Sequence, residues 1–423
     1  YADLSWYPRK RFQWAAFIST KADLLPPEQN QPIGREMNRV SGLGMVIDDY
    51  AQKPVKIVPS FYNGAVYMSE EQMEGMRIKV KTNDAFYKEI CTIDPRLKPV
   101  FDAWRFADSA KSLLQSLLKI REQLLEQYRS GEGTYAFKYR YWMGTNLFKD
   151  YALQVACLFA DKTISISTTD MARIVWDDNN VPLIDSAGVN FGPANMAFQY
   201  RNNGRIFFAL LLAHDPEFTG RARQMQKVIN TDIEEAIYPN GSAFGSPHYI
   251  QATIEPILFS ILQLKNAGIA DLFQSNKKIR DFTGFYATLI TPPSVRFQLN
   301  RKLISFGDGS EESAPAFALL ATGFADIDSL LSEQLLSLFF YGAPRSTLFG
   351  PVTLVVDLSA RPPNLFEATT ANYTGYVSHF RSGVNTSNET ALWVLNGNGF
   401  YDHRNDDAGE VAIYALKAPL SLS

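Results

Sequence analysis

His403 is the residue whose side chain is best suited to catalysis. It lies in the charged loop Asp402–Asp407 beside Arg404 and Asn405. After one glycine the loop enters residues 410–416, where the side chains alternate as they do on a β-strand. Imidazole changes its protonation near neutral pH, so a histidine at the end of a buried strand is a candidate for acid–base chemistry. The alternative is a surface turn whose histidine is only solvated.

Two more loops carry polar residues. Residues 181–204 contain several prolines, glycines and asparagines, a composition typical of a long loop. Most asparagines in such loops only make turns. Residues 238–249 are also rich in turn formers, and they lead into an apolar segment at 250–267 that ends at Gly268.

The elements that would position these loops are helical first and β-stranded later. Apolar residues recur at steps of three and four, which predicts helices. These helices are expected at residues 101–128, 135–161, 205–214, 215–237, 250–267, 271–291, 314–322 and 326–340. After residue 341 the pattern alternates, which predicts strands at residues 352–356, 375–382, 391–395 and 410–416.

This order of elements predicts an α+β multidomain protein. Residues 1–345 would form a helical domain, and residues 346–423 the start of an antiparallel β-sheet domain. The helical pairs are compatible with an (α/α) toroid, although no sequence repeat establishes one. Because a sheet of about four strands is thin, we expect the sheet domain to be truncated, with further protein after residue 423 or in another chain.

Composition narrows the class of protein. The chain has 423 residues, of which 46% are hydrophobic, enough for a large core and two or three domains. Its net charge of −3 argues against nucleic-acid binding. No apolar run reaches the roughly 18 residues that would indicate a membrane span. Cys91 and Cys157 match no metal-site spacing and are interpreted as buried thiols or one disulfide, with thiols favoured.

Four motifs occur in order: Pro239–Tyr249, Phe306–Gly309, Asn372–Gly383, and the His403 loop with its strand and Pro-Leu step. Together they resemble the heparinase II/III-like polysaccharide lyases. In that family a turn-rich loop with a catalytic tyrosine precedes a toroid helix, and a Gly-Tyr strand opens the sheet domain. The resemblance covers roughly residues 190–423.

The resemblance implies an incomplete (α/α) toroid followed by an antiparallel β-sheet domain. It also implies β-elimination of a uronic-acid-containing polysaccharide, which leaves an unsaturated uronate. The reaction needs a neutralised carboxylate, a base for the C5 proton and an acid for the leaving oxygen. An acidic polysaccharide is then the expected partner and a secreted or periplasmic location is expected, while an oligomer stays open.

Catalytic roles follow from the same resemblance. Tyr249 matches the family tyrosine and would be the acid and could also be the base. A phenol has an unperturbed pKa near 10, so base work needs a nearby cation, which His248 could supply. The alternative for Tyr249 is an aromatic side chain packed at a helix start. His403 matches the family histidine and would be a base or would polarise the carboxylate, whereas His379, on a predicted strand, is interpreted as structural.

The uronate carboxylate would be bound by an asparagine of the toroid. Asn195 is the first choice, and Asn190 and Asn203 are close rivals. Arginine recognises carboxylate groups well. The arginines expected to bind the acidic sugar are Arg201, Arg205 and Arg404.

No cofactor is required by this chemistry. Some relatives place a second histidine in the sheet-domain loop that helps to hold a metal, but Asn405 stands there in this chain. That puts a zinc site in doubt. Asp406, Asp407 and His403 could still hold a divalent cation.

Two other functions stay open. A glycoside hydrolase on a similar toroid would need two carboxylates facing each other across the sugar. Asp185, Glu255 and Asp308 are candidates, but none forms a recognisable pair in the sequence. A non-catalytic carbohydrate-binding protein is the second alternative.

Overall fold

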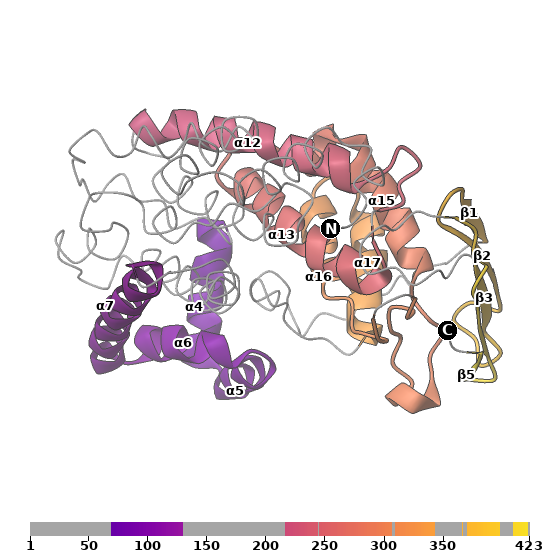
Figure 1. Cartoon of the computed structure of the whole chain (residues 1–423). Coiled ribbons are helices and arrows are strands. Elements are labelled where there is room, and N and C mark those ends of the chain that lie inside the picture. Colours follow the sequence, from indigo (N-terminus) through magenta and orange to yellow (C-terminus); the bar gives the residue numbers. More distant parts are fainter. Residues whose placement is uncertain are drawn as a thin grey trace. The chain divides into compact units, whose positions relative to one another are not determined.

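The computed structural model describes residues 69–129, 216–243, 245–306, 309–342, 366, 370–397 and 409–421 (Figure 1). The chain divides into two compact units. One comprises Tyr1–Gly64 and Phe106–Val228, and the other comprises Ala65–Arg105 and Ile229–Ser423. Within the described ranges, the helices precede residue 343 and the strands follow residue 370, so the predicted order of helices and then strands is confirmed.

The first described helical elements are α4 (Glu70–Thr82), α5 (Asp84–Ile93), the short η3 (Pro95–Leu97), α6 (Lys98–Arg105) and α7 (Ala107–Arg129). Polar N-caps start three of them: Ser69 for α4, Asn83 for α5 and Asp94 for η3. Ser69 and Gln72 form a reciprocal capping box at the start of α4, which satisfies two backbone N–H groups. The single helix predicted over 101–128 is two helices, because Phe106 is not helical and its carbonyl accepts the first hydrogen bonds of α7.

The second set of helices comprises α12 (Pro216–Ala236), α13 (Pro247–Asn266), α14 (Leu272–Ser275), α15 (Lys277–Thr288), η4 (Val295–Phe297), α16 (Ala316–Phe324) and α17 (Ser329–Tyr341). Apart from η4, these helices overlap the predicted segments, whereas the helices predicted at 135–161 and 205–214 lie outside the described residues. The boundary between the two units falls inside α12. Helix α13 is buried along most of its length, and α16 packs against both α13 and α17. Asp271 and Asn276 cap α14 and α15, which explains why the predicted helix 271–291 is divided.

The strands form one antiparallel sheet in sequence order (Figure 1). They are β1 (Ala371–Tyr373), β2 (Val377–Ser382), β3 (Thr390–Leu395), β4 (Val411–Ala415) and β5 (Ala418–Ser421). One face is buried and includes Val377, Trp393 and Tyr414, whereas Phe380 on the other face is 50% exposed. This alternation confirms three predicted strands, and the strand predicted at 352–356 lies outside the described residues.

Aromatic side chains join the sheet to the end of α15. Trp393 on β3 donates its indole N–H to the carbonyl of Thr288 at 2.7 Å. The ring of Phe285 meets the rings of Tyr373 and Tyr376 edge-on, with centroids 5.0 Å apart in each pair. The buried face of the sheet is therefore packed against the helical segment that precedes it.

Three sequence predictions concern the chain as a whole. The proposed domain boundary at residues 345 and 346 falls outside the described residues and stays a prediction. Cys91 is a free thiol, as favoured, but it is only partly buried, and Cys157 is not among the described residues. No helix in the described ranges has both the length and the apolar character needed to cross a bilayer.

The packing of α16 on α14 leads to a stability prediction. A Cβ on Gly323 would lie 2.2 Å from a ring carbon of Phe273, which is buried and packs edge-on against Phe324. Gly323→Ala should therefore lower the free energy of unfolding by about 1–3 kcal/mol, measured by urea denaturation. In the control Gly284→Ala, the nearest atom is a Tyr373 oxygen at 3.5 Å, an ordinary contact. That helical substitution should raise stability by about 0.5–1 kcal/mol, and equal effects of the two changes would contradict the prediction.

Candidate active site

The first turn of α13 presents His248 and Tyr249. Pro247 occupies the first helical position, where its missing N–H costs nothing. Gly245 precedes the helix with φ +105°, a conformation that favours glycine, and a Cβ there would lie 3.3 Å from Cβ of Tyr249. The Pro-x-Tyr sequence after a glycine turn therefore places both side chains at the start of the helix.

A chain of hydrogen bonds holds His248. Its Nδ1 lies 2.8 Å from Oε1 of Glu312, and Gln251 donates from Nε2 to Oε2 of the same carboxylate at 3.1 Å. The Tyr286 hydroxyl donates to Oε1 of Gln251 at 3.0 Å. These hydrogen bonds connect Tyr286, which is fully buried, to the imidazole of His248, which is 38% exposed. A carboxylate and an imidazole so arranged form a unit that can orient a proton-transferring ring.

Tyr249 lies directly against this imidazole. The two rings meet edge-on, with centroids 4.8 Å apart. Gly309 also lies close to His248, since a Cβ on Gly309 would lie 2.9 Å from Cβ of His248. Gly309, the last residue of the Phe306–Gly309 motif, is therefore a neighbour of the tyrosine loop in the fold.

The sheet also positions this helix start. The Tyr376 hydroxyl donates to the carbonyl of Gly245 at 2.8 Å, and Asn240 donates from Nδ2 to the carbonyl of Thr374 at 3.1 Å. Burial raises the pKa of Tyr376 well above its usual value, so its phenol stays protonated and remains a donor. The loop that precedes α13 is thus anchored to the turn between β1 and β2.

The other predicted site residues are not among the described residues. They are Asn190, Asn195, Arg201, Asn203, Arg205, His403 and Arg404, together with the possible cation ligands Asp406 and Asp407. Their roles, and their proximity to Tyr249, stay predictions. Strand β4, which follows the His403 loop, contacts the segment that holds His248, because Tyr414 donates to Oε1 of Glu311 at 3.1 Å.

The described ranges contain one of the three hydrolase candidates and none of the predicted cation ligands. Glu255 is 3% exposed within α13, so a sugar in solvent does not reach it, and Asp185 and Asp308 fall outside those ranges. No group of three or more His, Cys, Asp or Glu side chains that could hold a metal ion occurs there.

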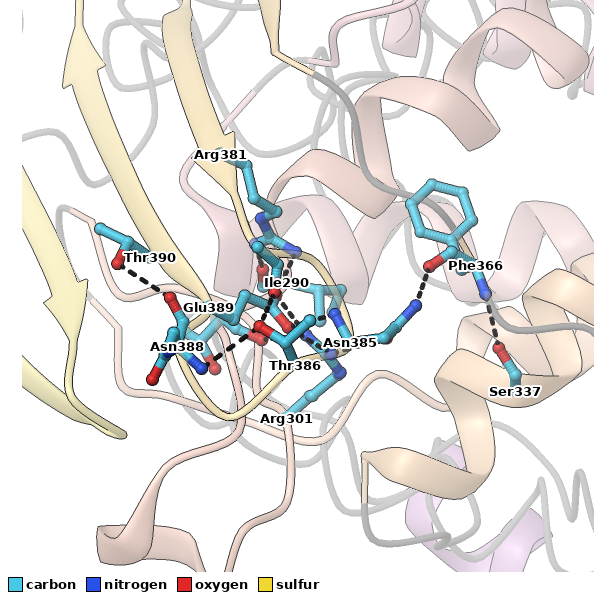
Figure 2. Close-up of polar contacts among 12 residues, drawn as sticks. Ile290, Arg301, Ser337, Phe366, Arg381, Asn385, Thr386, Asn388, Glu389 and Thr390 are labelled. Carbon is cyan, nitrogen blue, oxygen red and sulfur yellow. Dashed lines mark hydrogen bonds and ion pairs between the residues drawn. The ribbon is translucent and has the colours of Figure 1, made fainter.

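Sequence reasoning missed a buried ionic cluster between the sheet and the helical segment. Figure 2 shows Glu389 with Arg301 and Arg381 around it. Arg301 pairs with Glu389 through both guanidinium branches at 2.8 Å, and Arg381 lies 3.4 Å from the same carboxylate. All three side chains are at most 6% exposed.

Neighbouring groups satisfy the rest of this cluster. Arg301 also donates to Oδ1 of Asn385 at 2.9 Å, and Arg381 donates to the carbonyl of Ile290 and, at 3.2 Å, to Nε2 of His379. Asn385 donates a hydrogen bond to the carbonyl of Phe366. The N–H of Phe366 donates in turn to the hydroxyl of Ser337 on α17 (Figure 2). The cluster therefore ties the β2–β3 turn to the segments on either side of α16.

The charges in the cluster shift one another's pKa values. Burial alone would raise the pKa of Glu389, but the hydrogen bonds and charge of Arg301, with the charge of Arg381, lower it below its usual value. Burial lowers the pKa of Arg381 to about 9, so this arginine remains charged at neutral pH. Two cations and one anion are thus buried together.

His379 belongs to the same region. It is completely buried on β2, directly opposite Trp393 on β3, with ring centroids 5.0 Å apart. This burial fits the structural role that its strand position predicts. His379 and Arg381 are two residues apart in β2, so their side chains lie on the same face of the sheet. This spacing was the sequence signal that could have indicated a polar cluster on the buried face.

Solved polysaccharide lyases share the fold of this chain. A mutant of heparan sulfate lyase HepC from Pedobacter heparinus matches 98% of the chain with a TM-score of 0.54 and 10% identity. A heparinase III gene product with methylated lysines matches 98% with a TM-score of 0.52 and 12% identity. Another heparinase III structure matches 91% with a TM-score of 0.51 and 10% identity. No family model and no curated protein matches the sequence.

These matches confirm the resemblance at the level of the fold. In each case the chain covers 64% of the length of the solved structure. At 10–12% identity the similarity concerns the fold alone. The chain has the helix-then-sheet architecture of heparinase III and heparan sulfate lyase, while closure of its helices into an incomplete toroid stays a prediction.

The buried cluster leads to a pH-dependent prediction. Glu389→Gln leaves two buried arginines without their carboxylate, which should lower the free energy of unfolding at pH 7 by about 3–5 kcal/mol. Because folding lowers the pKa of Glu389, its stabilisation is present above the usual value of 4.5 and is lost as the pH falls below it. Urea denaturation from pH 7 to acid should show the two proteins converging in stability.

The control for this prediction is Asp326→Asn. It removes an exposed ion pair with Lys265, in which the Asp326 side chain is 69% exposed, and should cost at most about 1 kcal/mol. A loss at Glu389 no larger than this, or one that does not change with pH, would show that the cluster does not stabilise the fold as described.

Proposed function

We propose that this protein is a polysaccharide lyase that cleaves a uronic-acid-containing polysaccharide by β-elimination. The observation that carries the proposal is Tyr249 in the first turn of α13, against a His248 held by Glu312. The fold is shared with solved heparan sulfate lyase and heparinase III structures. Alginate, ulvan and glycosaminoglycans are the substrate classes that fit an elimination at uronate.

The reaction divides into two proton transfers and one charge neutralisation. A base removes the proton from C5 of the uronate, the C5–H electron pair forms the C4–C5 double bond, and the bond from C4 to the leaving oxygen breaks. An acid protonates that oxygen. Neutralising the carboxylate makes the C5 proton acidic, which is why hydrogen-bond donors around the carboxylate lower the barrier.

The residues of this chain supply groups for each step. Tyr249 is the acid and could also be the base, assisted by the imidazole of His248 beside it. His403, in the loop before β4, is the base or polarises the carboxylate. Asn195 binds the carboxylate, with Asn190 and Asn203 as rivals. The polymer's acidic groups would be bound by Arg201, Arg205 and Arg404.

Cofactor and location follow from the same proposal. The reaction requires no cofactor, although a divalent cation at His403, Asp406 and Asp407 would help to neutralise charge. An enzyme meets a long polysaccharide outside the cytoplasm, so we propose a secreted or periplasmic location. Whether the protein forms an oligomer is left open by this chemistry.

Ultraviolet absorbance of the unsaturated uronate tests the proposal. Absorbance should rise on one polymer of a panel of alginate, ulvan, heparan sulfate, chondroitin sulfate and hyaluronan. Tyr249→Phe, which removes only the hydroxyl, should lower kcat by about 10²–10⁴-fold, and His403→Ala should do the same. Tyr341→Phe is the control, since that tyrosine is 50% exposed on α17 and should retain full activity.

Other outcomes would contradict the proposal in different ways. New reducing ends without ultraviolet absorbance would indicate a glycoside hydrolase. Binding of one polymer without cleavage would indicate a carbohydrate-binding protein. Full activity in both Tyr249→Phe and His403→Ala would show that these side chains do not carry the reaction.

A further inference from the structure

We propose that Glu312 is a positioning residue for His248, one that fixes the orientation and tautomer of the imidazole beside Tyr249. The inference rests on the proposed lyase function, to which it adds a residue that no sequence motif identifies. Glu312 acts through His248, whose Nδ1 lies 2.8 Å from its carboxylate.

The geometry around the carboxylate supports this role. Both oxygens of Glu312 are engaged, Oε1 with His248 at 2.8 Å and Oε2 with Gln251 at 3.1 Å. The carboxylate therefore cannot rotate without breaking one bond. Its side chain is 18% exposed and that of His248 is 38% exposed, so the support is better shielded from water than the ring it holds.

The backbone around the pair is also constrained. The carbonyl of Glu312 accepts a hydrogen bond from the N–H of Leu303 at 2.7 Å, within an isolated antiparallel bridge. Tyr286 is completely buried, and its hydroxyl holds Gln251, the other partner of the Glu312 carboxylate. A carboxylate mounted in this way holds an imidazole in one place, which is the condition for efficient proton transfer.

The tautomer follows from the donor and acceptor inventory. An ionised carboxylate only accepts hydrogen bonds, so Nδ1 of His248 carries the proton that points to Glu312. Nε2 is then the ring atom that takes up or releases a proton. Glu312 and Tyr249 are both titratable groups that lie against His248, so the pH dependence of activity should report on the arrangement.

The adjacent residue offers a matched control. Glu311 has other partners than Glu312: it pairs with Arg296 at 2.9 Å and accepts from Tyr414. Glu311→Gln therefore disturbs the same segment with the same chemical change, but it leaves the partner of His248 in place. It should lower stability without changing the pH profile of kcat.

Glu312→Gln is the test. The new amide nitrogen must face either the donor of Gln251 or the Nδ1–H of His248, so one link of the chain is lost whichever way the amide turns. We expect kcat on the cleaved polymer to fall about tenfold or more, with KM little changed and the pH profile shifted. An unchanged kcat and pH profile would overturn the proposal.

Histidine NMR gives a readout that does not depend on activity. With ¹⁵N-labelled histidine, and with His248→Gln to assign the signal, the wild type should show His248 protonated at Nδ1. In Glu312→Gln this preference should be lost, whereas in Glu311→Gln it should persist. If no polymer is cleaved, the lyase proposal fails while the NMR result still decides the role of Glu312; an unchanged His248 signal in Glu312→Gln overturns that role.

Discussion

The bidentate ion pair between Arg301 and Glu389 is the contact on which the packing of the sheet against the described helices depends most. The two residues are 88 positions apart, one before α16 and the other immediately before β3. A buried ion pair stabilises a fold little more than apolar residues of similar size would. Removing one partner, however, leaves an unpaired buried charge, which strongly lowers the free energy of unfolding. Here the consequence is sharper, because Arg381 adds a second buried cation that shares the carboxylate. The β2–β3 turn therefore has few alternative positions.

That constraint reaches the candidate site through the sheet. With the sheet held in place, Tyr376 and the β1–β2 turn fix the loop before α13, and Tyr414 on β4 fixes the segment of Glu311 and Glu312 from the other side. The start of α13 is thus held by two separate parts of the sheet. Catalytic groups need placement within fractions of an ångström, which a helix start braced in this way provides better than an isolated loop.

The sequence predicts the local part of this organisation well. Apolar periodicity located α12, α13, α16 and α17, and alternation located β2 to β4. It did not predict the break at Phe106, because an apolar residue there continues the helical pattern while its backbone departs from it. Nor could it pair Arg301 with Glu389 or His248 with Glu312. Such pairs are set by how distant segments pack, and periodicity carries no information about a partner 60 or more residues away.

Charge bears on which residues could bind an acidic polymer. Many described arginines already have a carboxylate partner: Arg77, Arg96, Arg105, Arg121, Arg280, Arg296, Arg301 and Arg381. A guanidinium in such a pair already has its charge offset by a carboxylate and some of its N–H groups engaged, so these residues are poorer candidates for binding a uronate. A chain with a net charge of −3 needs local cations to attract a polyanion. Under the proposed function, cationic side chains beyond these ion pairs supply that field, and Arg201, Arg205 and Arg404 stay the predicted ones.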